Sequence, residues 1–292
     1  MTFFKSVMTA VFACALALGP MVGTAHATQA RSQTDAAELK YKINIAGRQR
    51  MLSQRMARQI CAAETGIDVA ANRDAARVTA ETFGDVLTML RAGGGARDLK
   101  PETDPDVLDS LTQVVWLWQP YKTAMVDLAD DMITGDLDKI RQLNSGVLKA
   151  MNGAVGAMEA AAGGQMDADL ARTINVAGRQ RMLIERTMMW TCLHATGTDA
   201  AADAEQLRAA ADLFASSLAA LRMGEEGLVP PPMWELEAQL ELVEELWSGM
   251  SPLIDAATNG TPAQAHDLEQ MFVQGVILVE AMNDAVWMYE NF

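Results

Sequence analysis

The chain has 292 residues, of which 50% are apolar and 5% aromatic, and its formal net charge is −15. This length suits one large domain or two ordinary ones, and the alanine- and methionine-rich apolar content favours helices over sheets. The acidic balance argues against nucleic acid and anionic membrane surfaces as partners, because both are negatively charged. Clusters of basic residues in such a chain are therefore informative.

The N-terminal residues 1–27 are predicted to form a secretory signal peptide. Lys5 gives a weakly positive start, an apolar run follows from Val7 to Val22, and Ala25-His26-Ala27 has the small-x-small pattern of a cleavage site. An uncleaved membrane anchor is the alternative, because the run is only slightly shorter than a spanning helix. We predict export to the periplasm, and we expect no later stretch to cross a bilayer.

A ten-residue motif occurs twice in the chain. Ile43 to Leu52 returns as Ile174 to Leu183, at an offset of 131 residues. The same offset aligns pairs throughout both halves, among them Cys61 with Cys192, Phe83 with Phe214, Trp116 with Trp247, and Asn152 with Asn283. A constant offset over this length indicates two homologous domains, which we place at 28–162 and 163–292, joined at Gly163-Gly164.

Each unit is predicted to contain four helices. In the first unit, a motif helix covers about 35–64, and the breaks are Thr65-Gly66, Gly93-Gly94-Gly95 up to a helix start at Asp104-Pro105, and Gly135-Asp136. The second unit has breaks at Thr196-Gly197, 224–232 and 259–262. No alternation of period two indicates strands. We therefore predict an all-α fold of two tandem antiparallel four-helix bundles, with Trp116, Leu117, Trp118 and Trp247 in their cores.

Helical spacing gives the first motif helix two distinct faces. The face expected to pack into its own bundle carries Tyr41, Ile45, Leu52, Met56 and Ile60. The opposite face, here called the seam, carries Ile43, Ala46, Gly47, Arg50, Gln54, Ala57 and Cys61. The second motif helix has the matching seam Ile174, Ala177, Gly178, Arg181, Glu185, Met188 and Cys192. Two matching seams predict that the motif helices pack on each other about a pseudo-twofold axis.

Such packing would bring Arg50 and Arg181 together. Two guanidinium groups in a partly dry interface repel each other unless something negative lies between them, and a planar oxyanion can accept forked hydrogen bonds from both. Arg48, Arg55 and Arg58 of the first copy and Arg179 and Arg186 of the second add positive potential on a neighbouring face. The alternative is that these arginines pair with the many carboxylates of an acidic protein.

Cys61 and Cys192 lie on the same seams. If the two helices pair in parallel and in register, a disulfide can form where the Cα separation and Cβ directions allow it; the alternative is two buried free thiols. Catalytic and metal readings are weak, because Cys192 and His194 are two residues apart on a helix and point in different directions. We therefore expect no enzyme activity, no metal and no cofactor.

The two motifs resemble the signature box of the sensor domain of PilJ-type chemotaxis transducers and of the NarX/NarQ nitrate and nitrite sensor kinases. That box reads roughly I-N-x-A-G-x-x-R-M and is followed by a second arginine. The matching residues are Ile43-Asn44, Ala46-Gly47, Arg50-Met51 and Arg55, and Ile174-Asn175, Ala177-Gly178, Arg181-Met182 and Arg186.

The resemblance implies a periplasmic four-helix bundle that dimerises through this helix and, in nitrate-responsive members, binds ligand between symmetry-related box arginines. The candidate ligand-binding residues that it implies here are Arg50, Arg181, Gly47, Gly178, Arg55, Arg186, Asn44 and Asn175. This chain departs from the family in carrying two units in tandem, and we expect it to lack the family's flanking membrane helices and signalling modules. It also has Glu185 where the first copy has Gln54, and a carboxylate there could neutralise Arg181.

We therefore expect a soluble periplasmic sensory protein that binds a small oxyanion such as nitrate or nitrite between the two motif helices. Its signal would pass to a membrane sensor or chemoreceptor, and no nucleic acid is expected as a partner. The alternative is a ligand-free interaction module whose seam docks on a membrane sensor or chemoreceptor, or on a second copy of the chain in a homodimer.

Overall fold

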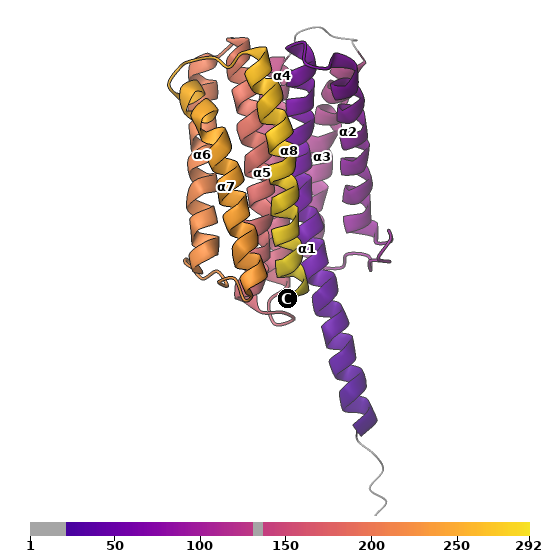
Figure 1. The fold of residues 1–292 in the computed structure, drawn as a ribbon. Coiled ribbons are helices and arrows are strands. Elements are labelled where there is room, and N and C mark those ends of the chain that lie inside the picture. The colour runs from indigo at the N-terminus through magenta and orange to yellow at the C-terminus, as the bar shows by residue number, and fades with distance from the viewer. Residues whose placement is uncertain (1–21, 131–136) are drawn as a thin grey trace, which may run out of the picture.

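A computed structural model describes the backbone of residues 22–130 and 137–292, and side chains from Asp35 onward. Its helices are shown in Figure 1: α1 Val22–Glu64, α2 Val69–Ala92, α3 Pro105–Ala129, α4 Leu137–Ala161, α5 Ala168–Thr196, α6 Ala200–Met223, α7 Trp234–Thr258 and α8 Ala265–Asn291. Most of the predicted signal peptide (residues 1–21) and the predicted break at Gly135-Asp136 lie outside the described residues. The first helix begins before the predicted residue 35, at Val22.

The described helices form the two predicted four-helix groups. Helices α1 to α4 pack against one another in the first unit, and α5 to α8 do so in the second (Figure 1). Among the described residues, β structure is limited to two isolated bridges in loops, Gly94 with Leu99 and Gly163 with Met166. The all-α expectation is thus confirmed.

Several helix boundaries follow from capping chemistry that the sequence displays. Asp104 caps α3, where its side chain accepts hydrogen bonds from the backbone N–H groups of Asp106 and Val107, and Pro105 occupies the first helical position. Gly197 and Gly224 end α5 and α6 in the left-handed conformation that glycine adopts without steric cost. Short, well-defined connections of this kind favour adjacent antiparallel helices.

The tryptophan assignments need one correction. Trp118 packs on Phe83, with ring centroids 4.2 Å apart and the rings tilted, and Trp247 stacks on Phe214 at 4.0 Å, so these two tryptophans are equivalent core residues. Trp116, which the constant offset aligns with Trp247, is 77% exposed. The loop before α7 is shorter than the loop before α3, which shifts the third helices by two residues relative to the repeat.

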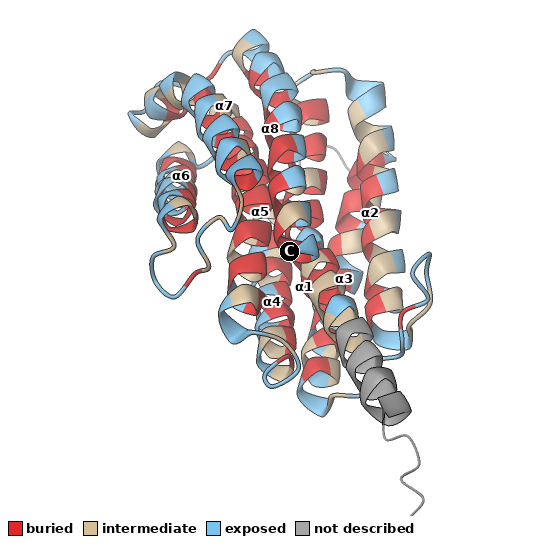
Figure 2. Ribbon diagram, turned by 60° about the horizontal axis from the view of Figure 1, so that its bottom comes forward, coloured by how far each residue is buried: buried red, intermediate tan, exposed pale blue. Residues whose placement is uncertain are grey.

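The motif helices α1 and α5 lie side by side at the centre of the molecule (Figure 1). Each is packed by its own bundle on one side and by the other motif helix on the opposite side. Both are therefore buried almost without interruption along their motif regions, whereas the outer faces of α6 and α7 are exposed (Figure 2).

Helix α8 is more apolar than the sequence analysis anticipated for any segment after the N-terminus. Among the described helices, it alone is long and apolar enough to span a bilayer, although no such later stretch was expected. Half of its apolar window is buried inside the molecule, because α8 packs on α5, α7 and α1. A core helix of a bundle meets the same criteria of length and composition as a spanning helix.

Candidate anion site between the two motif helices

The two seams meet as predicted, in parallel and in register. A Cβ atom built on Gly47 would lie 3.9 Å from the Cα of Gly178, so the backbones approach closely at this level. Fourteen residues further along each helix, Cys61 and Cys192 form a disulfide, with their Cα atoms 6.2 Å apart. At 1.5 Å rise per residue, the two helices thus remain in contact over about 20 Å.

Arg50 and Arg181 converge at the glycine contact. A Cβ on Gly47 would lie 3.2 Å from Nη2 of Arg50 and 3.6 Å from Nη2 of Arg181, and a Cβ on Gly178 would meet the same two atoms at 3.6 and 3.2 Å. Both arginines are only 2% exposed. The absence of side chains at positions 47 and 178 therefore provides the space that the two guanidinium groups occupy.

Neutral groups hold each guanidinium in a pseudo-twofold arrangement. Arg50 donates from Nη1 to the side-chain oxygens of Asn175 and Asn152, at 2.8 and 3.3 Å, and from Nη2 to the backbone oxygen of Asn175 at 3.0 Å. Arg181 donates from Nη1 to Asn283 at 3.0 Å and from Nη2 to the backbone oxygen of Asn44 at 3.1 Å. Within the described residues, neither arginine forms an ion pair.

The carboxylates around the site contact the asparagines and not Arg50 or Arg181. The side-chain amide of Asn44 donates to Glu290 on α8, and that of Asn175 donates to Glu159 on α4. Arg97 also pairs with Glu290, at 2.8 Å. Negative charge is thus present around the site but is separated from Arg50 and Arg181 by an amide group.

Burial makes the arginine pair electrostatically unfavourable. Burial, together with the positive charge of Arg181, lowers the pKa of Arg50 to about 9. Burial and the charge of Arg48 likewise lower the pKa of Arg181 to about 9. Both side chains still carry a positive charge at neutral pH, so the free energy of the site falls if an anion is placed between them.

The second pair of box arginines has other partners. Arg55 donates to Glu185 at 2.6 Å, and Arg58 donates to the other oxygen of Glu185 at 2.8 Å. Arg186 donates to Gln54 at 3.5 Å and to Gln206 at 2.9 Å. Glu185 thus pairs with the arginines of α1 and not with Arg181, because its carboxylate reaches across the seam.

Four residues of the network were not identified from the sequence. Asn152 and Asn283 contact the arginines, and Glu159 and Glu290 anchor the box asparagines. Each pair recurs at the 131-residue offset. The recurrence was a usable signal, but only the packing of α4 and α8 against the motif helices gives these residues a role.

The seams are occupied within the chain. Ala46, Ala57 and Cys61 of the first seam and Ala177 and Cys192 of the second are fully or almost fully buried. An interaction module that docks through a free seam, or a homodimer built on it, would first have to separate the two units.

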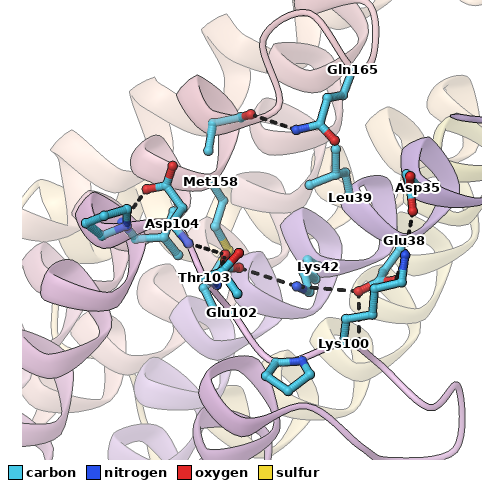
Figure 3. A pocket seen from close by; sticks show the side chains of 14 residues that line it. Asp35, Glu38, Leu39, Lys42, Lys100, Glu102, Thr103, Asp104, Met158 and Gln165 are labelled. Carbon is cyan, nitrogen blue, oxygen red and sulfur yellow. Dashed lines mark hydrogen bonds and ion pairs between the residues drawn. The ribbon is translucent and has the colours of Figure 1, made fainter.

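A second cavity, of about 420 Å³, lies beside the start of α3 and the end of α4 (Figure 3). Its buried Lys42 lies between Glu38 at 3.5 Å and Glu102 at 3.4 Å, and Lys100 pairs with Asp35. Both lysines of the lining are thus paired with carboxylates, and Asp104 adds a further negative charge, so this cavity does not present positive charge to an anion. The described residues also contain no cluster of three or more histidine, cysteine or carboxylate side chains suited to a metal ion.

Comparison with known families gives a match in both halves. The family described as the N-terminal domain of type IV pili methyl-accepting chemotaxis transducers (PilJ) matches residues 28–143 and 165–271. Each matched segment contains one motif helix with its box. No curated protein and no solved structure matches the chain significantly.

Proposed function

Because the chain belongs to the family of PilJ-type N-terminal sensory domains, of which it carries two copies, we propose that it is a periplasmic sensory protein that binds a small oxyanion between Arg50 and Arg181. Nitrate and nitrite are the first candidates. The observation that carries the proposal is the convergence of two buried guanidinium groups without an ion-pair partner in the described part of the chain.

The donor arrangement suits a small planar anion. An arginine has five N–H donors, and Arg181 uses one each from Nε, Nη1 and Nη2 on Gly178, Asn283 and Asn44. Arg50 uses four of its five donors, on Gly47, Asn152 and Asn175. One N–H of Nη2 therefore remains on each arginine, and both Nη2 atoms lie at the glycine contact. Donation from two guanidinium groups to one small oxyanion is a charge-assisted arrangement that favours its binding.

The periplasmic location is part of the proposal. The Cys61–Cys192 disulfide crosslinks the two units, and structural disulfides persist in oxidising compartments. The predicted signal peptide supports the same location.

Ligand binding can be converted into a signal through the packing of α1 on α5. An anion that holds Arg50 and Arg181 together favours one arrangement of the two bundles over others. A membrane sensor or chemoreceptor that contacts both bundles could then read this shift.

The experiment that tests the proposal is isothermal titration calorimetry with nitrate, nitrite, sulfate and chloride. The variants are Arg50→Gln with Arg181→Gln, and Arg50→Lys, which keeps the charge but not the fork. Arg91→Gln, which removes the charge of one exposed arginine of α2, is the control. We expect saturable binding of one oxyanion that the Arg91 variant retains and the double variant loses. Absence of heat from all four anions at millimolar concentration would refute the proposal.

The ligand-free module remains the second candidate, through a different surface. The outer face of α8 exposes Val273, Ile277 and Trp287, and the corresponding residues of α4 are Gln142, Gly146 and Gly156. The apolar character of this face is thus specific to the second copy. A partner complex that survives Arg50→Gln with Arg181→Gln but is lost on Trp287→Ser would favour this function.

A further inference from the structure

A third cavity opens between the two units, along α4 of the first and α5 and α6 of the second, with a volume of about 470 Å³. Its polar lining consists of Arg50, Asn152, Asn175, Arg179 and Arg186. Its apolar lining consists of Leu148, Met182, Leu183, Ala209, Ala210 and Leu213. A lining with three arginines and no carboxylate is notable in a chain with a net charge of −15.

No carboxylate neutralises the arginines of this cavity in the described part of the chain, and one of their N–H donors has no hydrogen-bond partner there. Nε of Arg179 is buried and has no hydrogen-bond partner among the described residues. Arg186 donates to the neutral side-chain oxygens of Gln54 and Gln206, and its guanidinium lies 5.4 Å from the ring centroid of Trp190. No ion pair of Arg50, Arg179 or Arg186 occurs within residues 35–130 and 137–292.

Carboxylates approach Arg179 from the other side. Glu159 and Glu226 line a smaller adjoining cavity together with Arg179 and Arg172. Glu159 accepts a hydrogen bond from Asn175, which fixes it behind the asparagine. The larger cavity thus presents positive charge, and its counter-charges lie outside it.

The two copies differ at this place. Arg48, the counterpart of Arg179, is exposed, and Arg55, the counterpart of Arg186, is neutralised by Glu185. The apolar residues Ala210 and Leu213 correspond to Thr79 and Thr82 in the first copy. The combination of uncompensated arginines with an apolar wall therefore belongs to the second copy and does not follow from the repeat itself.

We propose that this cavity binds an organic carboxylate with an apolar body. The carboxylate would take forked hydrogen bonds from Arg179 beside the positive charge of Arg50, and the body would lie against Leu148, Met182 and Leu213. The volume is within the range of small-molecule sites, which combine an apolar wall with a few placed polar groups. This site does not require the oxyanion site, because Arg181 does not line it, but the two share Arg50 and can influence each other.

The probe ligand is octanoate, measured by calorimetry on the full chain in constant chloride. Acetate carries the same head without a body, and octylamine carries the same body with the opposite charge. We expect saturable octanoate binding that is at least tenfold tighter than acetate binding, and no octylamine binding. Equal binding of octanoate and octylamine would mean a non-specific apolar surface and would overturn the proposal, as would an absence of octanoate binding.

Variants place the ligand in the cavity. Leu213→Glu adds a carboxylate at a position that is 42% exposed, so the fold should tolerate it, and it should abolish octanoate binding. Arg179→Gln should weaken binding at least tenfold, whereas the matched variant Arg48→Gln should leave it unchanged.

Arg181→Gln should retain octanoate binding while nitrate binding is lost, which separates failure of this proposal from failure of the oxyanion site. Octanoate affinity that is unchanged in both Leu213→Glu and Arg179→Gln would overturn the proposal.

Discussion

Glu185 on α5 accepts a hydrogen bond from Arg55 on α1 at 2.6 Å, and at the mirrored position Gln54 accepts one from Arg186 at 3.5 Å. The same contact thus crosses the seam in both directions, once as an ion pair and once as a neutral hydrogen bond. Glu185, the acidic residue specific to the second copy, is neutralised by arginines of the first copy. Arg181 therefore has no ion pair among the described residues.

Replacing Glu185 by glutamine should destabilise the protein. The change leaves Arg55 and Arg58 buried or half-buried without their carboxylate, at a cost of about 2–4 kcal/mol in the free energy of unfolding. Chemical denaturation followed by circular dichroism measures this change. Glu244→Gln, which removes a surface partner of Arg222, is the control and should change stability by less than about 1 kcal/mol. Equal effects of the two substitutions would contradict the ion-pair assignment.

The same carboxylate should make stability depend on pH. Burial acts to raise the pKa of Glu185, but the charges of Arg58 and Arg55 outweigh it and hold the pKa below the ordinary value of 4.5. Its contribution to stability is therefore complete above the ordinary pKa and is lost as the pH falls through the lowered value. We expect the wild type to lose stability below about pH 4.5 more steeply than Glu185→Gln. Parallel pH profiles would show that the group does not titrate as argued.

Methyl groups at the glycine contact should reduce anion binding more than stability. In Gly47→Ala with Gly178→Ala, each new Cβ would lie 3.2 Å from a guanidinium nitrogen. Crowding is offset by the better helix propensity of alanine, about 1 kcal/mol at each site. We expect little change in thermal unfolding and at least a tenfold loss of nitrate affinity in calorimetry. Gly153→Ala, at an exposed position with no neighbour within 4 Å of the new Cβ, should leave affinity unchanged; a similar loss there would point to an indirect effect.

Removal of the disulfide should destabilise the arrangement of the two units. The bond closes a loop of 131 residues, for which the chain-entropy relation gives about 5 kcal/mol. Denaturation of Cys61→Ala with Cys192→Ala should show most of this loss, and a reducing agent should lower the wild type to the same stability. The double variant is its own control, since the reducing agent should not affect it. A wild type insensitive to reduction would mean that the two thiols are not paired.

Two buried tyrosines, one in each bundle, allow a test of the polar network inside the first bundle. Tyr121 donates to the backbone oxygen of Ser53 at 2.7 Å and accepts from Asn144 at 2.9 Å. Tyr121→Phe should therefore cost about 1–2 kcal/mol in unfolding free energy. Tyr289, equally buried, has a hydroxyl without a hydrogen-bond partner among the described residues, so Tyr289→Phe should be neutral or stabilising. The reverse order of the two effects would contradict the network.

The convergence of Arg50 and Arg181 was predictable because two closely matching faces in one chain can bury each other about a pseudo-twofold axis. Their register also follows, since Gly47 to Cys61 spans the same number of residues as Gly178 to Cys192. The pairing of Trp118 with Phe83 was not predictable from the repeat, because a difference in loop length shifted the third helices. The partners of Glu185 depend on side-chain directions across the seam, which sequence spacing does not specify.

The covalent joining of α1 and α5 has a further consequence. A binding site divided between separate subunits disappears on dilution, and its occupancy then varies with the amount of protein as well as of ligand. In this chain the two arginines belong to one polypeptide, and a short connection holds the units at an effective concentration in the millimolar range or above. Occupancy of the site should therefore follow ligand concentration alone, even when the protein is scarce.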